Sequence, residues 1–118
     1  MIDTLKLILA DDENVIFAYL FGSHARGDAS SRSDVDVAVY LRDLSLERRL
    51  RLHHTLQKEL KCEVDLLVLN ETRNIYLLEN VLKKGILLKD APERPEFEVD
   101  TNLAILDFKA FRRYIDAA

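Results

Sequence analysis

Three short apolar runs limit the folds that this chain can adopt. They are VIFAYLF at residues 15–21, DVDVAVYL at residues 34–41 and CEVDLLVL at residues 62–69. Each is short and continuous, contains β-branched or aromatic residues, and is bounded by polar residues or glycine, which predicts a buried strand. ILLK at residues 86–89 predicts a fourth, short strand or an extended segment.

Helical periodicity fills the segments between these runs. Helices are predicted at residues 1–14, 44–61, 72–82 and 97–115. Ser45 and Thr72 stand at positions where N-caps are expected, and Lys83, Lys84 and Gly85 form a typical helix ending. Residues 23–33 predict a loop or a short helical turn, so the predicted order is helix, strand, loop, strand, helix, strand, helix, short strand and helix.

This alternation predicts a small α/β domain in which helices pack on a mixed sheet of three or four strands. A chain of 118 residues is the size of a single domain. Both prolines fall in residues 90–96, the one segment that is similar to a linker. We therefore expect one domain at residues 1–118, with its body at residues 1–90 and a C-terminal helix at residues 96–118.

Charge and cysteine content argue against several classes of protein. The net charge of −4 does not favour direct nucleic-acid binding, and the basic run ERRLRL at residues 47–52 is interpreted as a solvated helix face. The single cysteine, Cys62, cannot form an internal disulfide and is interpreted as a core residue. No apolar run approaches the ~20 residues needed to cross a bilayer, and the N-terminal residues do not resemble a signal peptide. We therefore expect a cytoplasmic protein that does not bind membranes.

Acidic residues interrupt two of the predicted strands. Asp34 and Asp36 point to the same face, about 7 Å apart along the strand, while the alternating valines point to the core. If residues 62–69 pair beside this strand, Asp65 brings a third carboxylate to the same face. Carboxylates that close repel one another unless they are protonated or compensated. Mg²⁺ is the natural compensator, and two such ions could hold both the attacking and the leaving oxygen of a phosphoryl or nucleotidyl transfer.

A Gly-Ser turn precedes the acidic strand. Gly22 has no Cβ and lets a phosphate approach the backbone, and Ser23 adds an N–H group and a hydroxyl. Arg26 lies three residues further on, where it can reach a polyphosphate oxygen. His24 neighbours this turn and could touch a substrate. An anion cradle at one strand end and metal ligands on the next strand predict a site for a nucleoside triphosphate with Mg²⁺.

Neither pattern is specific by itself. A lone Asp-x-Asp usually has no catalytic role, and Asp34 could simply cap a neighbouring segment. The combination of an apolar strand, Gly-Ser, Asp-x-Asp on a second strand and an Asp on a third favours catalysis. The serine-hydrolase elbow, the P-loop and zinc-ligand spacing are absent from the sequence. His53 and His54 are interpreted as helix-surface residues.

These residues resemble a known signature. Gly22-Ser23, ten intervening residues and Asp34-Val35-Asp36 are similar to the G-S-x10-D-x-D motif of the DNA polymerase β-like nucleotidyltransferases, and Asp65 matches the third carboxylate of that superfamily. The stretch FGSHARGDASSRSDVDVAV resembles the minimal nucleotidyltransferase (MNT) branch in particular. The resemblance extends to about residue 90.

The resemblance implies a nucleotidyltransferase fold and a Mg²⁺-dependent transfer of AMP from ATP to a hydroxyl, with release of pyrophosphate. Asp34 and Asp36 would bind the metal ions, and Asp65 would complete the site and help to deprotonate the attacking hydroxyl. Gly22 and Ser23 would hold the triphosphate, with Arg26 as a further contact. MNT proteins are typically partnered with HEPN toxins, so the resemblance also implies an antitoxin that transfers AMP to a tyrosine of its partner.

The last predicted helix is apolar on two sides. One stripe is Val99, Leu103, Leu106 and Ala110, and the other is Phe97, Ala104, Phe108, Phe111 and Ile115. Such a helix needs two surfaces to bury against, which are either the sheet and a partner or second copy, or the interior of one core.

Two other functions remain open. A small-molecule nucleotidyltransferase would share the motif but usually needs more chain for its acceptor, and a non-catalytic antitoxin would act by binding alone.

Overall fold

The computed structural model describes residues 1–30 and 32–117. Its helices and strands alternate as the sequence predicts, and the segment after β1 forms a single helical turn. The elements are α1 (Ile2–Asp11), β1 (Val15–Phe21), α2 (Ser23–Arg26), β2 (Val35–Leu41), α3 (Leu46–Leu60), β3 (Val64–Val68), α4 (Ile75–Lys84), β4 (Ile86–Lys89) and α5 (Arg94–Ala117).

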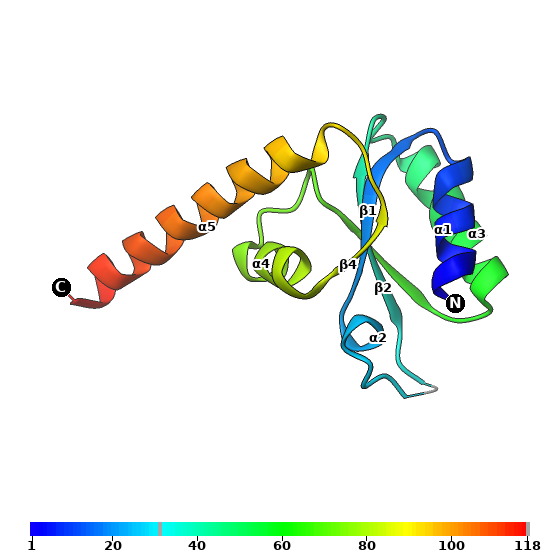
Figure 1. Cartoon of the computed structure of the whole chain (residues 1–118), viewed down its shortest axis with the longest axis horizontal. Helices are drawn as coiled ribbons and strands as arrows, with labels where there is room; N and C mark the ends of the chain where they lie inside the picture. Colours follow the sequence, from blue (N-terminus) through cyan, green and yellow to red (C-terminus); the bar gives the residue numbers. More distant parts are fainter. Residues whose placement is uncertain (31, 118) are drawn as a thin grey trace.

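The four strands form one mixed sheet in the order β3-β2-β1-β4. β1 is antiparallel to both β2 and β4, whereas β2 and β3 are parallel and are connected by α3. Helices α1 and α3 lie on one side of the sheet, and α4 and the start of α5 lie on the other (Figure 1). The predicted fold class, a small mixed sheet flanked by helices, is confirmed.

Both faces of the sheet are buried, which explains why its strands are nearly continuous apolar runs. The alternating residues Val35, Val37 and Val39 pack beneath α1 and α3 with Leu5 and Leu56. On the other face, a cluster rich in aromatic residues contacts α4 and α5. It contains Phe17, Tyr19, Phe21, Ala38, Leu69, Leu78 and Val81. Asp36 belongs to this second face, two residues before Ala38 along β2.

Local hydrogen bonds set the helix ends and correct two predicted boundaries. Ser45 caps α3 as predicted, because its side chain accepts from the Arg48 N–H. The prediction that Thr72 caps the next helix is wrong, since the side chain of Asn74 accepts from Leu77 N at 3.2 Å and α4 begins after it. The last helix begins at Arg94, inside the predicted linker, because a proline is tolerated in the first turn of a helix.

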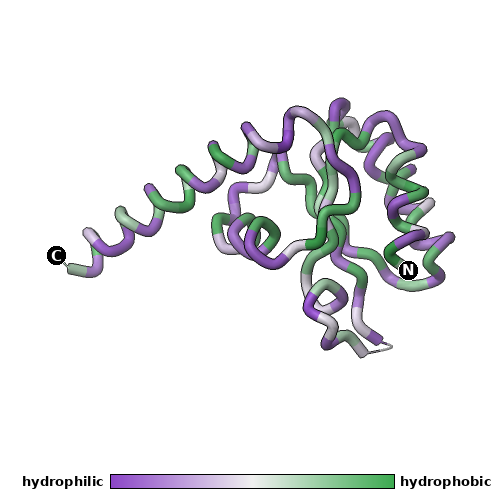
Figure 2. Tube along the Cα trace, in the orientation of Figure 1, coloured by the Kyte–Doolittle hydropathy of each residue, from purple (hydrophilic) through white to green (hydrophobic). Residues whose placement is uncertain are grey.

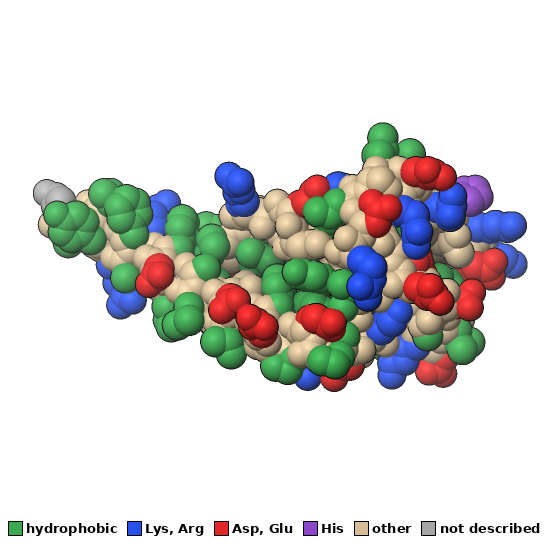
Figure 3. Space-filling model, turned by 90° about the horizontal axis from the view of Figure 1, so that it is seen from above, with side chains coloured by type: hydrophobic (Ala, Val, Ile, Leu, Met, Phe, Trp, Pro, Cys, Tyr) green, Lys and Arg blue, Asp and Glu red, His purple; other side chains and the backbone are tan. Residues whose placement is uncertain are grey.

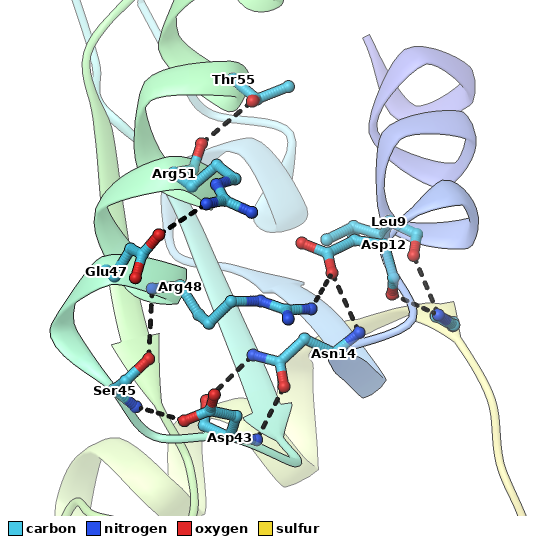
Figure 4. Close-up of polar contacts among 10 residues, drawn as sticks. Leu9, Asp12, Asn14, Asp43, Ser45, Glu47, Arg48, Arg51 and Thr55 are labelled. Carbon is cyan, nitrogen blue, oxygen red and sulfur yellow. Dashed lines mark hydrogen bonds and ion pairs between the residues drawn. The ribbon is translucent and has the colours of Figure 1, made fainter.

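The end of the sheet farthest from α2 is closed by polar contacts (Figure 4). The side chain of Asn14 donates to the Asp43 carbonyl at 2.9 Å and accepts from the Asp43 N–H at 2.7 Å. Lys89 Nζ donates to the carbonyls of Leu9, in the last turn of α1, and of Asp12, the residue that caps this helix. These bonds satisfy backbone groups, so this end of the sheet has a structural role.

Helix α5 leaves the body and makes the molecule elongated, with extents of 50 × 32 × 23 Å (Figures 1 and 2). Near its start, the Phe97 ring lies 5.3 Å from that of Phe17 and 5.4 Å from that of Tyr40. Further along, Phe108 packs edge-on against Tyr76 of α4 at 5.7 Å. Residues 110–117 are all exposed. No helix in the described ranges has the length and apolar character of a membrane span.

Candidate active site

The candidate site lies at the end of the sheet beside α2, where β1 ends and β2 and β3 begin (Figure 1). Gly22 follows β1 directly and has φ 74° and ψ −155°, a conformation that is essentially restricted to glycine. A Cβ at this position would lie 2.1 Å from Oδ2 of Asp36. The missing side chain of Gly22 is therefore what allows the backbone to lie against the Asp36 carboxylate.

The turn after Gly22 is one short helix, α2. The Gly22 carbonyl accepts from the N–H groups of Ala25 and Arg26, both at 3.1 Å, and Gly27 ends the turn with φ 82°. Ser23 is half-buried at the first position of this turn. Ala25 and Arg26 use their N–H groups within the turn, whereas the N–H groups of Ser23 and His24 precede these bonds and are available to an anion.

Asp36 and Asp65 lie side by side. They are paired positions in the parallel ladder between β2 and β3, and their side chains are on the same face of the sheet. Burial raises the pKa of Asp36 above its usual value, and the carboxylates of Asp65 and Asp34 raise the same pKa further, whereas His24 lowers it. The three carboxylates that the sequence singles out are therefore close enough to interact.

Asp34 is placed differently from the prediction. It precedes β2, which begins at Val35, and its side chain is exposed rather than buried within the strand. Asp65 is also exposed, although it is the second residue of β3. The site is therefore open to solvent on the side of Asp34 and Asp65, and closed on the side of Gly22.

Divalent cations match the donor chemistry of this cluster. Carboxylate oxygens are the ligands that Mg²⁺ prefers, and a cation would relieve the repulsion that raises the pKa of Asp36. In the described ranges, no three His, Cys, Asp or Glu side chains are already drawn together tightly enough to hold an ion. The three carboxylates fit the ion by their oxygen donors and by their shared position at one end of the sheet, rather than by a preformed cage.

Arg26 does not contact the carboxylates. Its Nε donates to Oδ2 of Asp28 at 3.2 Å, and both side chains are exposed. An exposed ion pair of this kind contributes little to stability, so an anionic ligand could replace Asp28 as the partner of Arg26 at small cost.

Two histidines contact the backbone next to the acidic residues, which the sequence did not reveal. His24 Nε2 lies 3.2 Å from the Ser33 carbonyl oxygen, and His53 Nε2 lies 2.7 Å from the Val64 carbonyl oxygen. The prediction that His53 is a helix-surface residue is wrong, because its ring is half-buried between α3 and β3. Only the spacing of His53 and Gln57, one helical turn apart, hinted at this arrangement.

Comparison with known proteins identifies the family. Residues 3–94 match the model of the family described as polymerase beta, nucleotidyltransferase. A putative protein adenylyltransferase of Methanocaldococcus jannaschii is 34% identical over 79 residues, which cover 64% of this chain and 79% of that protein. A second one from the same organism is 31% identical over 77 residues, with the same coverage of each chain.

Two solved structures extend the likeness to almost the whole chain. A toxin–antitoxin structure with AMP-PNP has a TM-score of 0.82 at 28% identity and covers 98% of this chain and 95% of its own. The structure of a tri-AMPylated Shewanella oneidensis HEPN toxin in complex with an MNT antitoxin has a TM-score of 0.73 at 27% identity, covering 99% and 97%. The resemblance drawn from the Gly-Ser and Asp-x-Asp motifs is confirmed. The chain belongs to the polymerase beta nucleotidyltransferase family, as one of its minimal members, and is a nucleotide-using enzyme.

Proposed function

We propose that this chain transfers AMP from ATP to a tyrosine hydroxyl of a partner HEPN toxin and thereby acts as its antitoxin. The observation that carries the proposal is the Asp36–Asp65 pair in a nucleotidyltransferase fold, with Asp36 held against the bare backbone of Gly22. The solved relatives that cover almost the whole chain include an MNT antitoxin in complex with an AMPylated HEPN toxin. We expect the pair to act in the cytoplasm.

Three carboxylates would hold the metal in this proposal. Asp34, Asp36 and Asp65 lie at one end of the sheet, and their mutual repulsion supports a role as ligands of one or two Mg²⁺ ions. Bound Mg²⁺ would supply charge stabilisation at the transferring phosphoryl group. Asp65 is exposed on the edge strand β3, so an incoming hydroxyl can reach this carboxylate to lose its proton.

The nucleotide would lie along the Gly-Ser turn. Gly22 keeps the backbone free of a side chain, and the first N–H groups of α2 together with the Ser23 hydroxyl would bind the triphosphate. Arg26 would exchange its ion pair with Asp28 for a polyphosphate oxygen. The chain's own contribution to the reaction is therefore to bind the donor and to hold it in line with the acceptor hydroxyl.

We propose a division of roles within one domain at residues 1–118. Residues 1–90 would carry catalysis, and the C-terminal helix at residues 96–118 would bind the partner. The outer stripe of α5, Val99, Leu103, Leu106 and Ala110, faces away from the body, and its three large side chains are all exposed. Hydrophobic side chains line the projecting helix in Figure 3. An exposed apolar stripe of this length is typical of a protein interface.

The exposed helix favours a protein acceptor over a small molecule. A small-molecule enzyme has no use for a long apolar stripe, whereas a partner protein would cover it and bring its own tyrosine to the site. The three carboxylates and the Gly-Ser turn argue against an antitoxin that acts by binding alone, because such a protein would not need them.

Intact-mass measurement of the HEPN partner tests the proposed function. The partner is incubated with the chain, ATP and Mg²⁺, and its mass should increase by one or more AMP units. The matched control uses Asp36→Asn, which keeps the size of the side chain but removes the charge. An unchanged partner mass with the parent chain would refute AMP transfer, and a stable complex in the same sample would then favour neutralisation by binding.

A further inference from the structure

Two histidines bind the peptide units that carry two of the candidate metal ligands. His24 Nε2 contacts the carbonyl of Ser33, the residue before Asp34, and His53 Nε2 contacts the carbonyl of Val64, the residue before Asp65. A carbonyl oxygen can only accept, so each Nε2 carries the proton. We propose that His24 and His53 are positioning residues that fix the backbone beneath Asp34 and Asp65. This inference rests on the proposed function for its catalytic consequence.

β3 needs such support because it is an edge strand. It has five residues and pairs only with β2, so the backbone groups of Val64 face away from the sheet. Helix α3 supplies both missing partners, because His53 donates to the Val64 carbonyl and Gln57 Oε1 accepts from the Val64 N–H at 3.2 Å. One helical turn separates the two side chains, which together replace a neighbouring strand. The register that sets Asp65 opposite Asp36 is thereby anchored to α3.

The segment before β2, which carries Asp34, also has few hydrogen bonds to the rest of the domain. Ser30, Arg32 and Ser33 bond mainly to one another, since Ser33 N donates to the Ser30 carbonyl, Arg32 N donates to the Ser30 hydroxyl and the two serine hydroxyls lie 3.2 Å apart. Among the described residues, His24 makes the only side-chain hydrogen bond that joins α2 to this segment. Asp34 lies outside the strand and is exposed. The His24 bond therefore connects the peptide before Asp34 to α2, the short helix that starts at Ser23 of the Gly-Ser turn.

The position of His53 excludes direct contact with substrate. His53 belongs to α3, which covers the opposite face of the sheet from the side chains of Asp36 and Asp65. It can therefore act only through the backbone of β3. Asp36 has no comparable tether and does not need one, because it lies inside β2 with a paired strand on each side.

Leucine and glutamine substitutions at each histidine test this role. His24→Leu and His53→Leu keep apolar bulk but remove the donor, whereas His24→Gln and His53→Gln place an N–H donor at similar reach. Losing an outer partner of a metal ligand typically costs about 10–100-fold in activity, so we expect that loss in kcat for the leucine variants and recovery by glutamine. His54→Leu, exposed on the same helix, is the matched control and should keep parent activity.

A measurement without substrate separates this inference from the proposed function. The backbone amide resonances of Asp34 and Asp65 should shift in the corresponding leucine variants of the full chain and return toward parent positions with glutamine. If the parent chain transfers no AMP, the proposed function fails, but these resonances still decide the positioning role. Unshifted resonances, or leucine variants with parent kcat, would overturn the inference. Loss of activity that glutamine fails to restore, with a folded protein, would overturn it as well.

Discussion

At the scale of single residues, two constraints meet at Gly22. Its backbone conformation is closed to other residues, and the space that a Cβ would occupy is filled by the carboxylate of Asp36. Gly27, five residues later, also has a positive φ of 82°, but no atom lies within 4 Å of its Cβ position. Substitutions at the two glycines therefore distinguish the cost of backbone strain alone from the cost of the close approach to the Asp36 carboxylate.

Gly22→Ala should destabilise the fold more than Gly27→Ala. The Gly27 substitution meets only backbone strain, about 1–2 kcal/mol, whereas the Gly22 substitution adds a clash with Asp36. Denaturant unfolding of both variants measures the difference. AMP transfer should be lost in Gly22→Ala and largely kept in Gly27→Ala. Equal losses of stability and transfer in the two variants would contradict the close approach.

Asp36→Asn should stabilise the metal-free protein at neutral pH while abolishing transfer. The folded state raises the pKa of Asp36, so the native protein holds its proton more tightly than the unfolded chain does. This costs stability once the pH exceeds the usual aspartate pKa of about 3.9, and the cost is complete above the raised value. The gain of Asp36→Asn should therefore appear as the pH rises through that window. Thermal melting of both proteins across acidic and neutral pH, with a chelator present, measures this gain. A gain in melting temperature that is the same at every pH would contradict the raised pKa of Asp36.

At the scale of elements, α5 is held to the sheet by one polar cluster next to its aromatic contacts. The Tyr19 hydroxyl, from β1, donates to Glu98 at 2.5 Å, and Arg94 pairs with Glu98 at 3.0 Å and with Asp90 at 2.6 Å. Burial and the hydrogen bond to Glu98 both raise the pKa of Tyr19. The first turn of α5 is thereby fixed, Phe108 and Lys109 contact α4 further along, and residues 110–117 are exposed.

Tyr19→Phe should lower the free energy of unfolding by about 1–2 kcal/mol, because it removes a hydrogen bond to a charged group. The parent should also lose stability as the pH rises above about 10, since the folded state keeps the Tyr19 proton that the unfolded chain releases. That alkaline loss should be smaller in Tyr19→Phe. Tyr114→Phe, at a position that is 73% exposed, is the control and should match the parent. Equal free energies of unfolding for Tyr19→Phe and Tyr114→Phe would show that the cluster does not anchor α5.

At the scale of the whole molecule, the candidate site and the apolar helix are separate features. The site lies beside α2, while α5 starts at the other end of the sheet and extends away from the body (Figure 1). Of the two predicted stripes, the outer one is exposed, and the second is divided. Phe97 and Phe108 face the body, whereas Phe111 and Ile115 lie beyond the contact with α4 and are exposed. Phe108→Asp would therefore also disturb the packing of α5 on the body. A position on the outer stripe is the better probe of a partner interface.

Leu106→Asp should weaken assembly with the HEPN partner while leaving the fold and ATP binding intact. Leu106 is 60% exposed on the outer stripe, so a charge there costs little in the free chain but is unfavourable in an apolar interface. Sedimentation of the mixed proteins measures the assembly, and transfer to the partner should fall with it. Leu7→Asp, 73% exposed on α1 across the sheet, is the control. Assembly unchanged in Leu106→Asp would exclude the outer stripe as the interface.

The sequence by itself determined the local structure and the chemistry of the candidate ligands. The strands around Phe17, Val37 and Leu66 and the cap at Ser45 follow from side-chain shape, alternation and nearby hydrogen bonds, which act over a few residues. The Gly22-Ser23 and Asp34-Val35-Asp36 spacing is likewise local. These features were predictable because the residues that create them are adjacent in the chain.

The tertiary structure alone decided how distant segments meet. The strand order, the register of Asp36 against Asp65 and the bonds from His24 and His53 all join segments that local patterns cannot place relative to one another. The same is true of α5, whose two apolar sides fit a core helix and a projecting helix equally well in sequence. Its exposure follows from where the body ends, and that depends on the packing of α4 against β1 rather than on the helix itself.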